Sequence, residues 1–327
     1  MPLIKKIWRP LAAIALLFIL IKKGPFQLEQ IHFILSQQKV LLIGLILFSL
    51  QFVLFSYRWS LFVHLLVPLK LKPAFRLTLI GQFFSFFIPG GVGGDVVKAL
   101  ELSRTQPINK KDALSTVLAD RILGLFTMIL MSALFLLIEV YRTPDERLSH
   151  LLVVSSLLLL CVTTGLFLAP WIIQKTEFLF INKTHFIFIK LEKLIASFAL
   201  TFAAFRNKKL QFINLLFCIS IQCISIYFLY DIVQTLGISA PPFLVFFSIC
   251  CFGFLASAIP ITPAGIGVGQ AAFYFLFATY SPELGRAAVT AVSVLQIFNL
   301  LFALFGGILF SIQPKKVRQS EMQSELL

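Results

Sequence analysis

Charged residues are scarce in this sequence. Asp, Glu, Lys and Arg make up 13% of the 327 residues, whereas hydrophobic residues make up 59%. Soluble globular domains carry about 25% charged and about 45–50% apolar residues. Because a soluble fold needs a polar surface that this composition cannot supply, the sequence excludes a soluble domain and predicts an integral membrane protein.

Residues that bind metals or act in catalysis are also few. The five cysteines lie inside apolar stretches, and the four histidines lie far apart near the ends of apolar runs. Neither set has the spacing of metal ligands or of a secreted disulfide framework. The sequence also lacks a Gly-Lys-Ser/Thr phosphate loop and a paired-aspartate glycosyltransferase signature. We therefore expect no metal, no cofactor and no catalytic residue, and favour a protein that is not an enzyme.

The charge that is present is mainly basic. Lys and Arg number 28 against 14 Asp and Glu, which gives a net charge of +14. On a soluble protein this would suggest nucleic acid, but here the basic residues lie between apolar runs, so we expect contact with anionic lipid and no nucleic acid. Basic connections alternate with balanced or uncharged ones. This asymmetry predicts that both termini lie in the cytoplasm.

Long apolar runs predict an all-α polytopic membrane protein, because about 20 apolar residues span a bilayer as a helix. Six runs predict full crossings, of which the first is the shortest: 11–21, 40–66, 113–140, 148–173, 210–236 and 287–312. Tyr57, Arg58 and Trp59, near the end of the second run, are expected to anchor it at one interface. Residues 1–312 thus form one transmembrane domain, and 313–327 form a polar cytoplasmic tail.

The connection over residues 176–206 has a different pattern. Its apolar residues recur at spacings of three and four beside a basic face. This pattern is typical of an amphipathic helix that lies in the plane of the membrane interface. A plain cytoplasmic connector is the alternative.

Two further apolar runs, 75–104 and 241–280, are interrupted by proline and glycine. The first contains Ile-Pro-Gly-Gly-Val-Gly-Gly-Asp over 88–95, and the second contains Ile-Pro-Ile-Thr-Pro-Ala-Gly-Ile-Gly-Val-Gly-Gln over 259–270. Proline and glycine interrupt a helix at bilayer depth only where protein or a watery cavity satisfies the freed backbone groups. Each run is therefore expected to form a broken or re-entrant helical hairpin.

The two breaks resemble each other. The pattern Pro-small-Gly-aliphatic-Gly begins at Pro89 and again at Pro263, 174 positions later, and the same offset pairs Ala113 with Ala287. Three crossings separate the two hairpins, so the second enters from the opposite side of the membrane. This arrangement predicts an inverted repeat, and such breaks point to a transporter's binding site. A chance match is the alternative, because proline and glycine are common in membrane helices.

A helix that begins inside the membrane presents unpaired N–H groups and the positive end of its dipole, which suit a phosphate or carboxylate. The candidate substrate-binding residues are the glycines of both breaks and the polar residues beside them: Gly91, Gly93, Gly94, Asp95, Lys98, Asp120, Arg121, Gly265, Gly267, Gly269 and Gln270. The alternative is that Asp95 only caps its half-helix and that Asp120 and Arg121 only form structural ion pairs with Asp95 or Lys98.

Three ordered motifs resemble a known family, the lysylphosphatidylglycerol synthase transmembrane-region family of flippase-like proteins. They lie over 88–98 with 102–104, over 119–125 and over 263–270. Lys98 stands where the family often has arginine, and Gln270 stands where it often has glutamate, which removes a possible carboxylate. The resemblance implies a stand-alone form of the domain that moves an aminoacylated phospholipid between leaflets in the multiple-peptide-resistance proteins. Only fifteen residues follow Ile312, so we expect no soluble synthase domain and no lipid aminoacylation.

The favoured function is a lipid translocase, or a transporter of a lipid-linked carrier, of the bacterial cytoplasmic (inner) membrane. It is expected to bind an anionic head group at the two breaks. Its expected partner is a membrane phospholipid or a polyprenyl-phosphate-type lipid. Two alternatives belong to other classes. One is a membrane-embedded lipid-modifying enzyme, which would require a new lipid product. The other is an accessory subunit that docks an envelope-synthesis enzyme.

Overall fold

The structure is a computed structural model that describes residues 27–88, 93–259 without 180–207, and 261–312. The shortest predicted crossing at 11–21, nearly all of the predicted interfacial helix and the tail lie outside these residues. In the described part the chain is helical and contains no strand. Its α-helices are α2 (Leu28–Ser36), α3 (Gln38–Val63), α4 (Leu71–Phe87), α5 (Gly93–Thr105), α6 (Lys110–Arg142), α7 (Glu146–Leu179), α9 (Lys208–Thr235), α10 (Phe243–Ser257), α11 (Val268–Ala278) and α12 (Pro282–Ser311).

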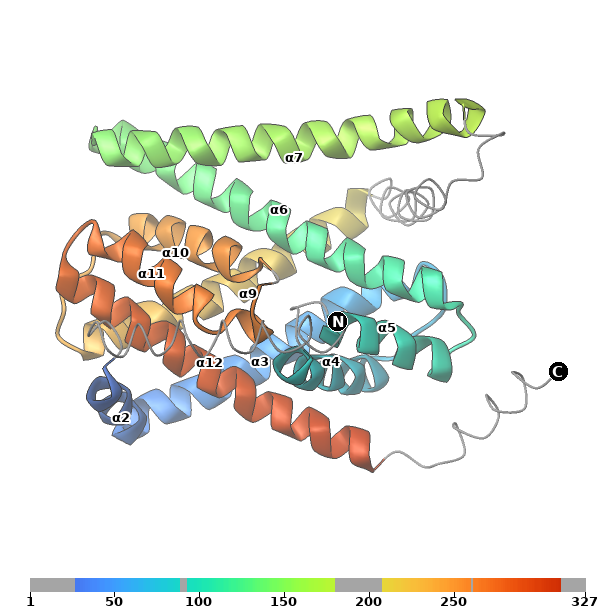
Figure 1. Cartoon of the computed structure of the whole chain (residues 1–327), viewed down its shortest axis with the longest axis horizontal. Helices are drawn as coiled ribbons and strands as arrows, with labels where there is room; N and C mark the ends of the chain where they lie inside the picture. The colour runs from blue at the N-terminus through green and yellow to red at the C-terminus, as the bar shows by residue number, and fades with distance from the viewer. Residues whose placement is uncertain (1–26, 89–92, 180–207, 260, 313–327) are drawn as a thin grey trace, which may run out of the picture.

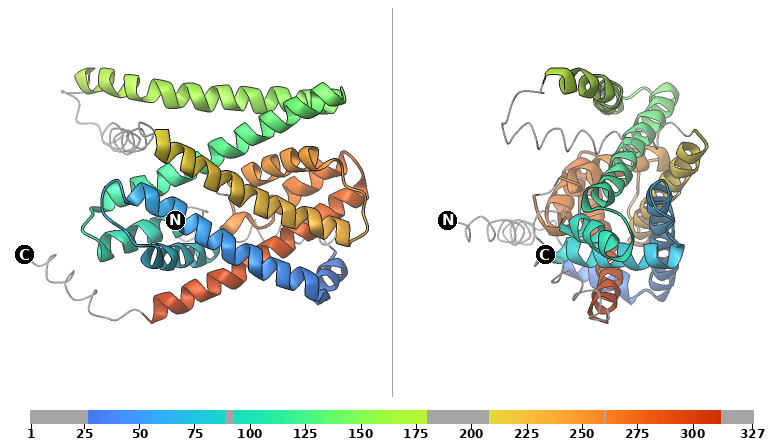
Figure 2. Two further views of the ribbon diagram at one scale, coloured as in Figure 1. Left: turned by 180° about the vertical axis from the view of Figure 1, so that it is seen from behind. Right: turned by 90° about the vertical axis from the view of Figure 1, so that its right-hand side faces the viewer.

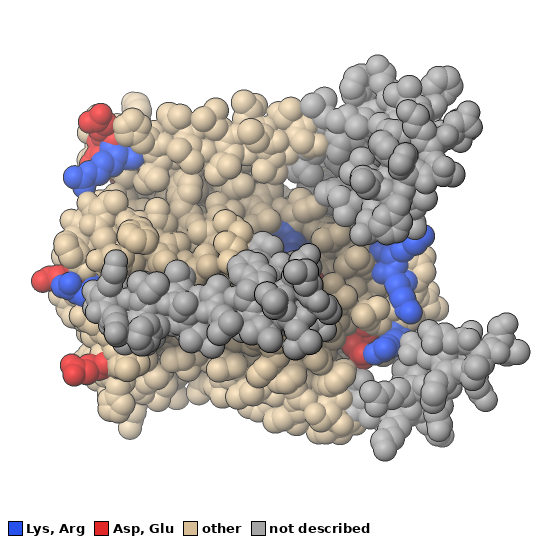
Figure 3. Space-filling model, viewed as in Figure 1, with Lys and Arg blue, Asp and Glu red and all other residues tan. Residues whose placement is uncertain are grey.

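Five of the described helices are long and apolar enough to cross a membrane: α3, α6, α7, α9 and α12. They confirm the predicted crossings after the first one, and with them an all-α polytopic membrane protein. The short helix α2, which packs on α12 and α3, was not predicted from the sequence. The charges visible in Figure 3 fit this assignment. They lie at the two ends of the molecule, apart from a basic group in a recess near the centre of the face.

The two runs interrupted by proline and glycine are broken, as predicted. The first forms α4 and α5, which turn back on each other next to Pro89, and the second forms α10 and α11. A 3₁₀ turn, Pro263–Gly265, lies between α10 and α11, and Gly265 and Gly267 have positive φ angles of 69° and 85°. A glycine adopts such angles without steric cost, which allows the tight reversal. Figures 1 and 2 show the two hairpins opening toward opposite ends of the bundle.

The half-helices of each hairpin approach closely because glycine faces serine. A Cβ on Gly94 would lie 2.0 Å from the Ser85 Oγ, and one on Gly269 would lie 2.8 Å from the Ser257 Oγ. Each serine donates a hydrogen bond to the carbonyl four residues earlier in its own helix, at 3.1 Å for Ser85 and 2.7 Å for Ser257. The same contact between a glycine and a serine therefore brings the two half-helices of each hairpin close together.

The long helices join the hairpins into one bundle. Helix α6 packs against α5 and α10, and α12 packs against α11 and α4, so each long helix contacts both hairpins. Helices α3 and α9 pack on each other across an aromatic core. In this core the ring centroids of Phe48, Phe228 and Phe298 lie within 5.4 Å of one another. Helix α7 packs on α6 at the edge of the bundle (Figures 1 and 2). The hairpin tips consequently meet in the interior.

Candidate functional site

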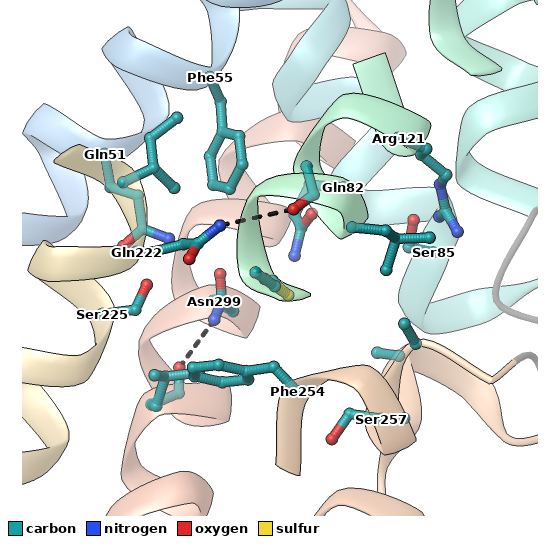
Figure 4. A pocket seen from close by; sticks show the side chains of 18 of the residues that line it. Gln51, Phe55, Gln82, Ser85, Arg121, Gln222, Ser225, Phe254, Ser257 and Asn299 are labelled. Atoms are coloured by element: carbon teal, nitrogen blue, oxygen red, sulfur yellow. Dashed lines mark hydrogen bonds between the residues drawn. The ribbon is translucent and has the colours of Figure 1, made fainter. Parts of the chain in front are cut away.

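A cavity of about 410 Å³ lies where the two hairpins meet. Residues of α3, α4, α6, α9, α10 and α12 line it, together with the turn before α11. Nine of the 26 lining residues have polar but uncharged side chains. They are Gln51, Gln82, Ser85, Gln222, Ser225, Ser257, Thr262, Gln296 and Asn299. Figure 4 shows Gln51, Gln222, Ser225 and Asn299 gathered on one side of the cavity, with Arg121 on the other.

An ion pair between α3 and α6 lies in the wall of the cavity. The guanidinium of Arg58 donates two hydrogen bonds to Asp120, from Nε at 2.7 Å and from Nη2 at 2.9 Å. The two side chains are only 6% and 12% exposed. Arg58 also donates to the Cys218 Sγ at 3.1 Å. The planar fork of an arginine matches a carboxylate in this geometry, so this pair holds α3, α6 and α9 together.

A second ion pair joins the first hairpin to α6. Asp95, in the first turn of α5, pairs with Arg121. One turn further along α5, the buried Lys98 Nζ lies 3.8 Å from the centre of the Trp59 ring and is attracted by Asp95 and Asp120. Arg58, Asp95, Lys98, Asp120 and Arg121 are called the charged cluster below. It contains three cations and two anions, so its formal charge is +1.

The structure places only some of the candidate residues at the cavity. Asp120, Arg121 and Gly265 line it directly. Asp95 and Lys98 belong to the charged cluster, and Gly93 and Gly94 begin the helix that carries them. Gly267, Gly269 and Gln270 begin α11 beside the cavity without lining it. Gly91 lies outside the described residues.

The Gln270 side chain makes hydrogen bonds that stabilise the chain at the second break. Its Oε1 accepts a hydrogen bond from the Gly267 backbone N–H at 2.7 Å. Its Nε2 donates to the Gln296 Oε1 at 2.6 Å and to the Ser293 Oγ at 3.3 Å. This side chain, 2% exposed, therefore caps α11 and ties it to α12, and it reaches the cavity only through Gln296.

The sequence assignment of Arg58 as an interfacial anchor is wrong, and so is that of Trp59. Both are buried, whereas their neighbour Tyr57 is exposed. The Trp59 indole N–H donates to the Thr116 Oγ1 at 3.2 Å, and Arg58 pairs with Asp120. The sequence suggested an interface because these residues lie near the end of an apolar run. Only the packing of α3 on α6 shows that this end of the helix is enclosed by protein.

The polar amides of the cavity were also missed. They are glutamines and an asparagine inside apolar runs, such as Gln51 in α3 and Gln222 in α9. Polar residues at membrane depth are costly and favour functional roles. That signal was present in the sequence, but it did not tell which amides share one cavity.

The residues that line the cavity can make several kinds of contact with a ligand. In the part of the chain that the structure describes, no three His, Cys, Asp or Glu side chains are grouped so that they could hold a metal ion. The cavity offers arginine for an anion, amides and hydroxyls for hydrogen bonding, and apolar walls. Its volume lies in the range of ligand pockets, about 300–1,000 Å³.

These features define a polytopic membrane protein with a polar cavity between two opposed helical hairpins. The sequence model of the lysylphosphatidylglycerol synthase transmembrane region matches residues 7–309, so the chain belongs to this family of membrane domains. Comparison with curated proteins and with solved structures gives no match. Family membership points to a function related to membrane lipids.

Proposed function

We propose that this protein is a lipid translocase, or a transporter of a lipid-linked carrier, of the bacterial cytoplasmic membrane. It binds an anionic head group in the cavity between the hairpins. The observation that carries the proposal is the charged cluster beside the cavity, of which Arg58, Asp120 and Arg121 line the wall. Arg58 and Asp120 are almost fully buried in the bundle. Ionised side chains buried inside a membrane protein are costly and mark substrate pathways.

The net charge of the cluster favours an anion. Asp120 neutralises Arg58, and Asp95 neutralises Arg121, which leaves the positive charge of Lys98. Arg121 is the most accessible of the paired cations, with 38% of its side chain exposed, compared with 6% for Arg58. An arriving phosphate can therefore reach Arg121 and is attracted by the excess charge.

We also infer that the two halves form an inverted repeat. Exchanging α3 with α9, α4 with α10, α5 with α11 and α6 with α12 converts every substantial packing pair among these eight helices into another observed pair. The bounds of the exchanged helices agree with the offset of 174 residues to within a few positions at most ends. Alternating access by movement of one repeat against the other would expose the cavity to each leaflet in turn.

The remaining parts of the proposal concern orientation and chemistry. Both termini lie in the cytoplasm, as the basic connections indicate. The protein changes the leaflet of its lipid and leaves the lipid's covalent structure unchanged, so it is not an enzyme. An envelope-synthesis enzyme that makes or uses the lipid is a possible partner.

The test is translocation in proteoliposomes that contain the full chain and head-group-labelled anionic lipid. We expect protein-dependent movement with no new lipid product. Asp95→Asn combined with Arg121→Gln removes an ion pair without leaving an unpaired charge, and Lys98→Gln removes the excess charge. Both variants should lose most of the movement. The matched control is Lys111→Gln, an exposed lysine at the start of α6.

Three outcomes would contradict the proposal. Unchanged rates in both variants would exclude the charged cluster as the binding site. A modified lipid would indicate an enzyme. Movement that requires a stoichiometric partner protein would indicate an accessory subunit.

A further inference from the structure

The cavity contains more neutral hydrogen-bonding groups than an anionic head group alone requires. Five carboxamides line it: Gln51, Gln82, Gln222, Gln296 and Asn299. They come from α3, α4, α9 and α12, so they surround the cavity from several sides. Hydroxyl groups of serine and threonine lie between them. A lipid phosphate accepts hydrogen bonds and therefore pairs only with donors. It does not account for so many lining groups that can also accept hydrogen bonds.

Three oxygens in the side chains of residues that line the cavity lack a hydrogen-bond partner among the described residues. They are the Oε1 atoms of Gln51 and Gln222 and the Oγ1 of Thr262. Their residues are only 5%, 5% and 2% exposed. Buried polar atoms are nearly always hydrogen-bonded, because leaving them unpaired costs stability. These oxygens have almost no accessible surface, so a ligand in the cavity reaches them only after the side chain turns, and it must then donate hydrogen bonds.

Three kinds of head group can be compared with this lining. A phosphate accepts but does not donate. An ammonium donates, but the excess positive charge of the cluster repels it, and both acidic residues of the cluster are paired with arginine. A hydroxyl both donates and accepts, as a carboxamide does whichever way its oxygen and nitrogen are oriented. Several hydroxyls in one head group match several amides.

The walls of the cavity agree with a ring-shaped or extended polyol. Phe55 and Phe254 form flat apolar surfaces beside the amides (Figure 4). A sugar or cyclitol presents apolar C–H groups as well as hydroxyls, so it can contact both kinds of wall. Arg121 lines the same cavity, which places a phosphate next to the polyol.

We propose that the ligand of this cavity is a lipid whose head group is a polyol or sugar joined through a phosphate. The proposal rests on the proposed function and specifies its substrate class. The amides and hydroxyls bind the polyol, and Arg121 binds the phosphate. A phospholipid with a cyclitol head group and a polyprenyl phosphate that carries a sugar share this chemistry.

The test is lipid binding to the purified full chain in a detergent without a sugar head group, measured by lipid-dependent thermal stabilisation. The probes are phosphatidylinositol, glucosyl-phosphoryl polyprenol, phosphatidic acid and lysylphosphatidylglycerol. We expect at least one of the first two to bind about tenfold more tightly than either of the others, since each neutral hydrogen bond contributes several-fold in affinity. The comparison between the first two identifies the lipid that carries the polyol.

The variant Gln51→Leu combined with Gln222→Leu removes two of the five lining carboxamides. We expect affinity for the polyol lipid to fall about tenfold, to that of phosphatidic acid, while phosphatidic acid binding is unchanged. Without lipid the variant should unfold at the same temperature or higher, because two buried unpaired oxygens are removed and only one long hydrogen bond is lost, that of 3.4 Å from the Gln222 Nε2 to the Gly124 carbonyl. This second measurement separates lost binding from lost folding. Gln234→Leu, at an exposed position of α9, is the matched control.

Equal affinity for all four lipids, or a preference for lysylphosphatidylglycerol, would overturn this proposal and leave a translocase for other lipids intact. Absence of translocation with a clear polyol preference would overturn the proposed function and support a polyol-lipid binding protein. The two failures are therefore distinguishable.

Discussion

The ion pair between Arg58 and Asp120 gives the sharpest test of how the bundle is held together. The perturbation is a double-mutant cycle with Arg58→Gln, Asp120→Asn and the two combined. The pair has two hydrogen bonds of 2.7 and 2.9 Å and almost no exposure to solvent. Removing one partner leaves a buried charge without its counter-charge, which costs about 3–5 kcal/mol. We expect each single variant to lose this much of the free energy of unfolding.

The double variant should lose less free energy of unfolding than the two single variants lose together. It leaves no unpaired charge, so we expect a coupling free energy of at least about 2 kcal/mol. The assay is reversible unfolding in mixed micelles, with denaturing detergent as the variable. Arg142→Gln, at the exposed end of α6, is the control and should change stability by less than about 0.5 kcal/mol. Additive effects of the two substitutions within about 0.5 kcal/mol would refute the reasoning, because independent sites add.

Two further predictions concern the helix breaks. Gly94→Ala places a Cβ 2.0 Å from the Ser85 Oγ, so it should push α5 away from α4 and destabilise the protein by about 1–3 kcal/mol. Gly165→Ala in α7 is the control, because no atom lies within 4 Å of the added Cβ, and it should be neutral or stabilising. Equal thermal unfolding temperatures of the two variants would contradict the close contact between Gly94 and Ser85. Gln270→Glu loses the donor to Gln296 and should cost about 1–3 kcal/mol at neutral pH. Gln234→Glu is its exposed control, and full stability of the Gln270 variant would show that the network rearranges.

Much of the fold could be predicted because bilayer thickness sets the length of an apolar helix. This constraint is local in the sequence, so runs such as 113–140 correspond closely to α6. The breaks were equally accessible, since Pro89 and the glycines after it cannot continue a helix at that depth. Helix α2 was missed because its nine residues are too few to give a crossing signal, and its position depends on packing against α12 and α3.

The candidate site could be predicted less completely, for reasons that are also physical. The sequence indicated Asp95 because it directly follows a proline–glycine break, and Arg121 because it lies in the next apolar run. The structure pairs these two side chains. Arg58 was assigned elsewhere, because its partner Asp120 lies 62 residues away and no local pattern reports such a contact. The glutamines of the cavity raise the same difficulty. A single amide in an apolar run shows that something polar is needed, but not which other helix faces it.

The two arginines at the cavity are not equivalent, and the difference bears on how a head group could be both bound and released. Arg58 is enclosed and held by two hydrogen bonds to Asp120 as well as by Cys218, so a phosphate would have to break several contacts to reach it. Arg121 is more than a third exposed, and its partner Asp95 lies in the first turn of a half-helix next to the break. A phosphate that pairs with Arg121 would compete with Asp95 and loosen the link between the first hairpin and α6. Binding at this arginine would therefore be coupled to movement of the hairpin, whereas Arg58 and Asp120 would keep α3 and α6 fixed as the frame against which that movement occurs.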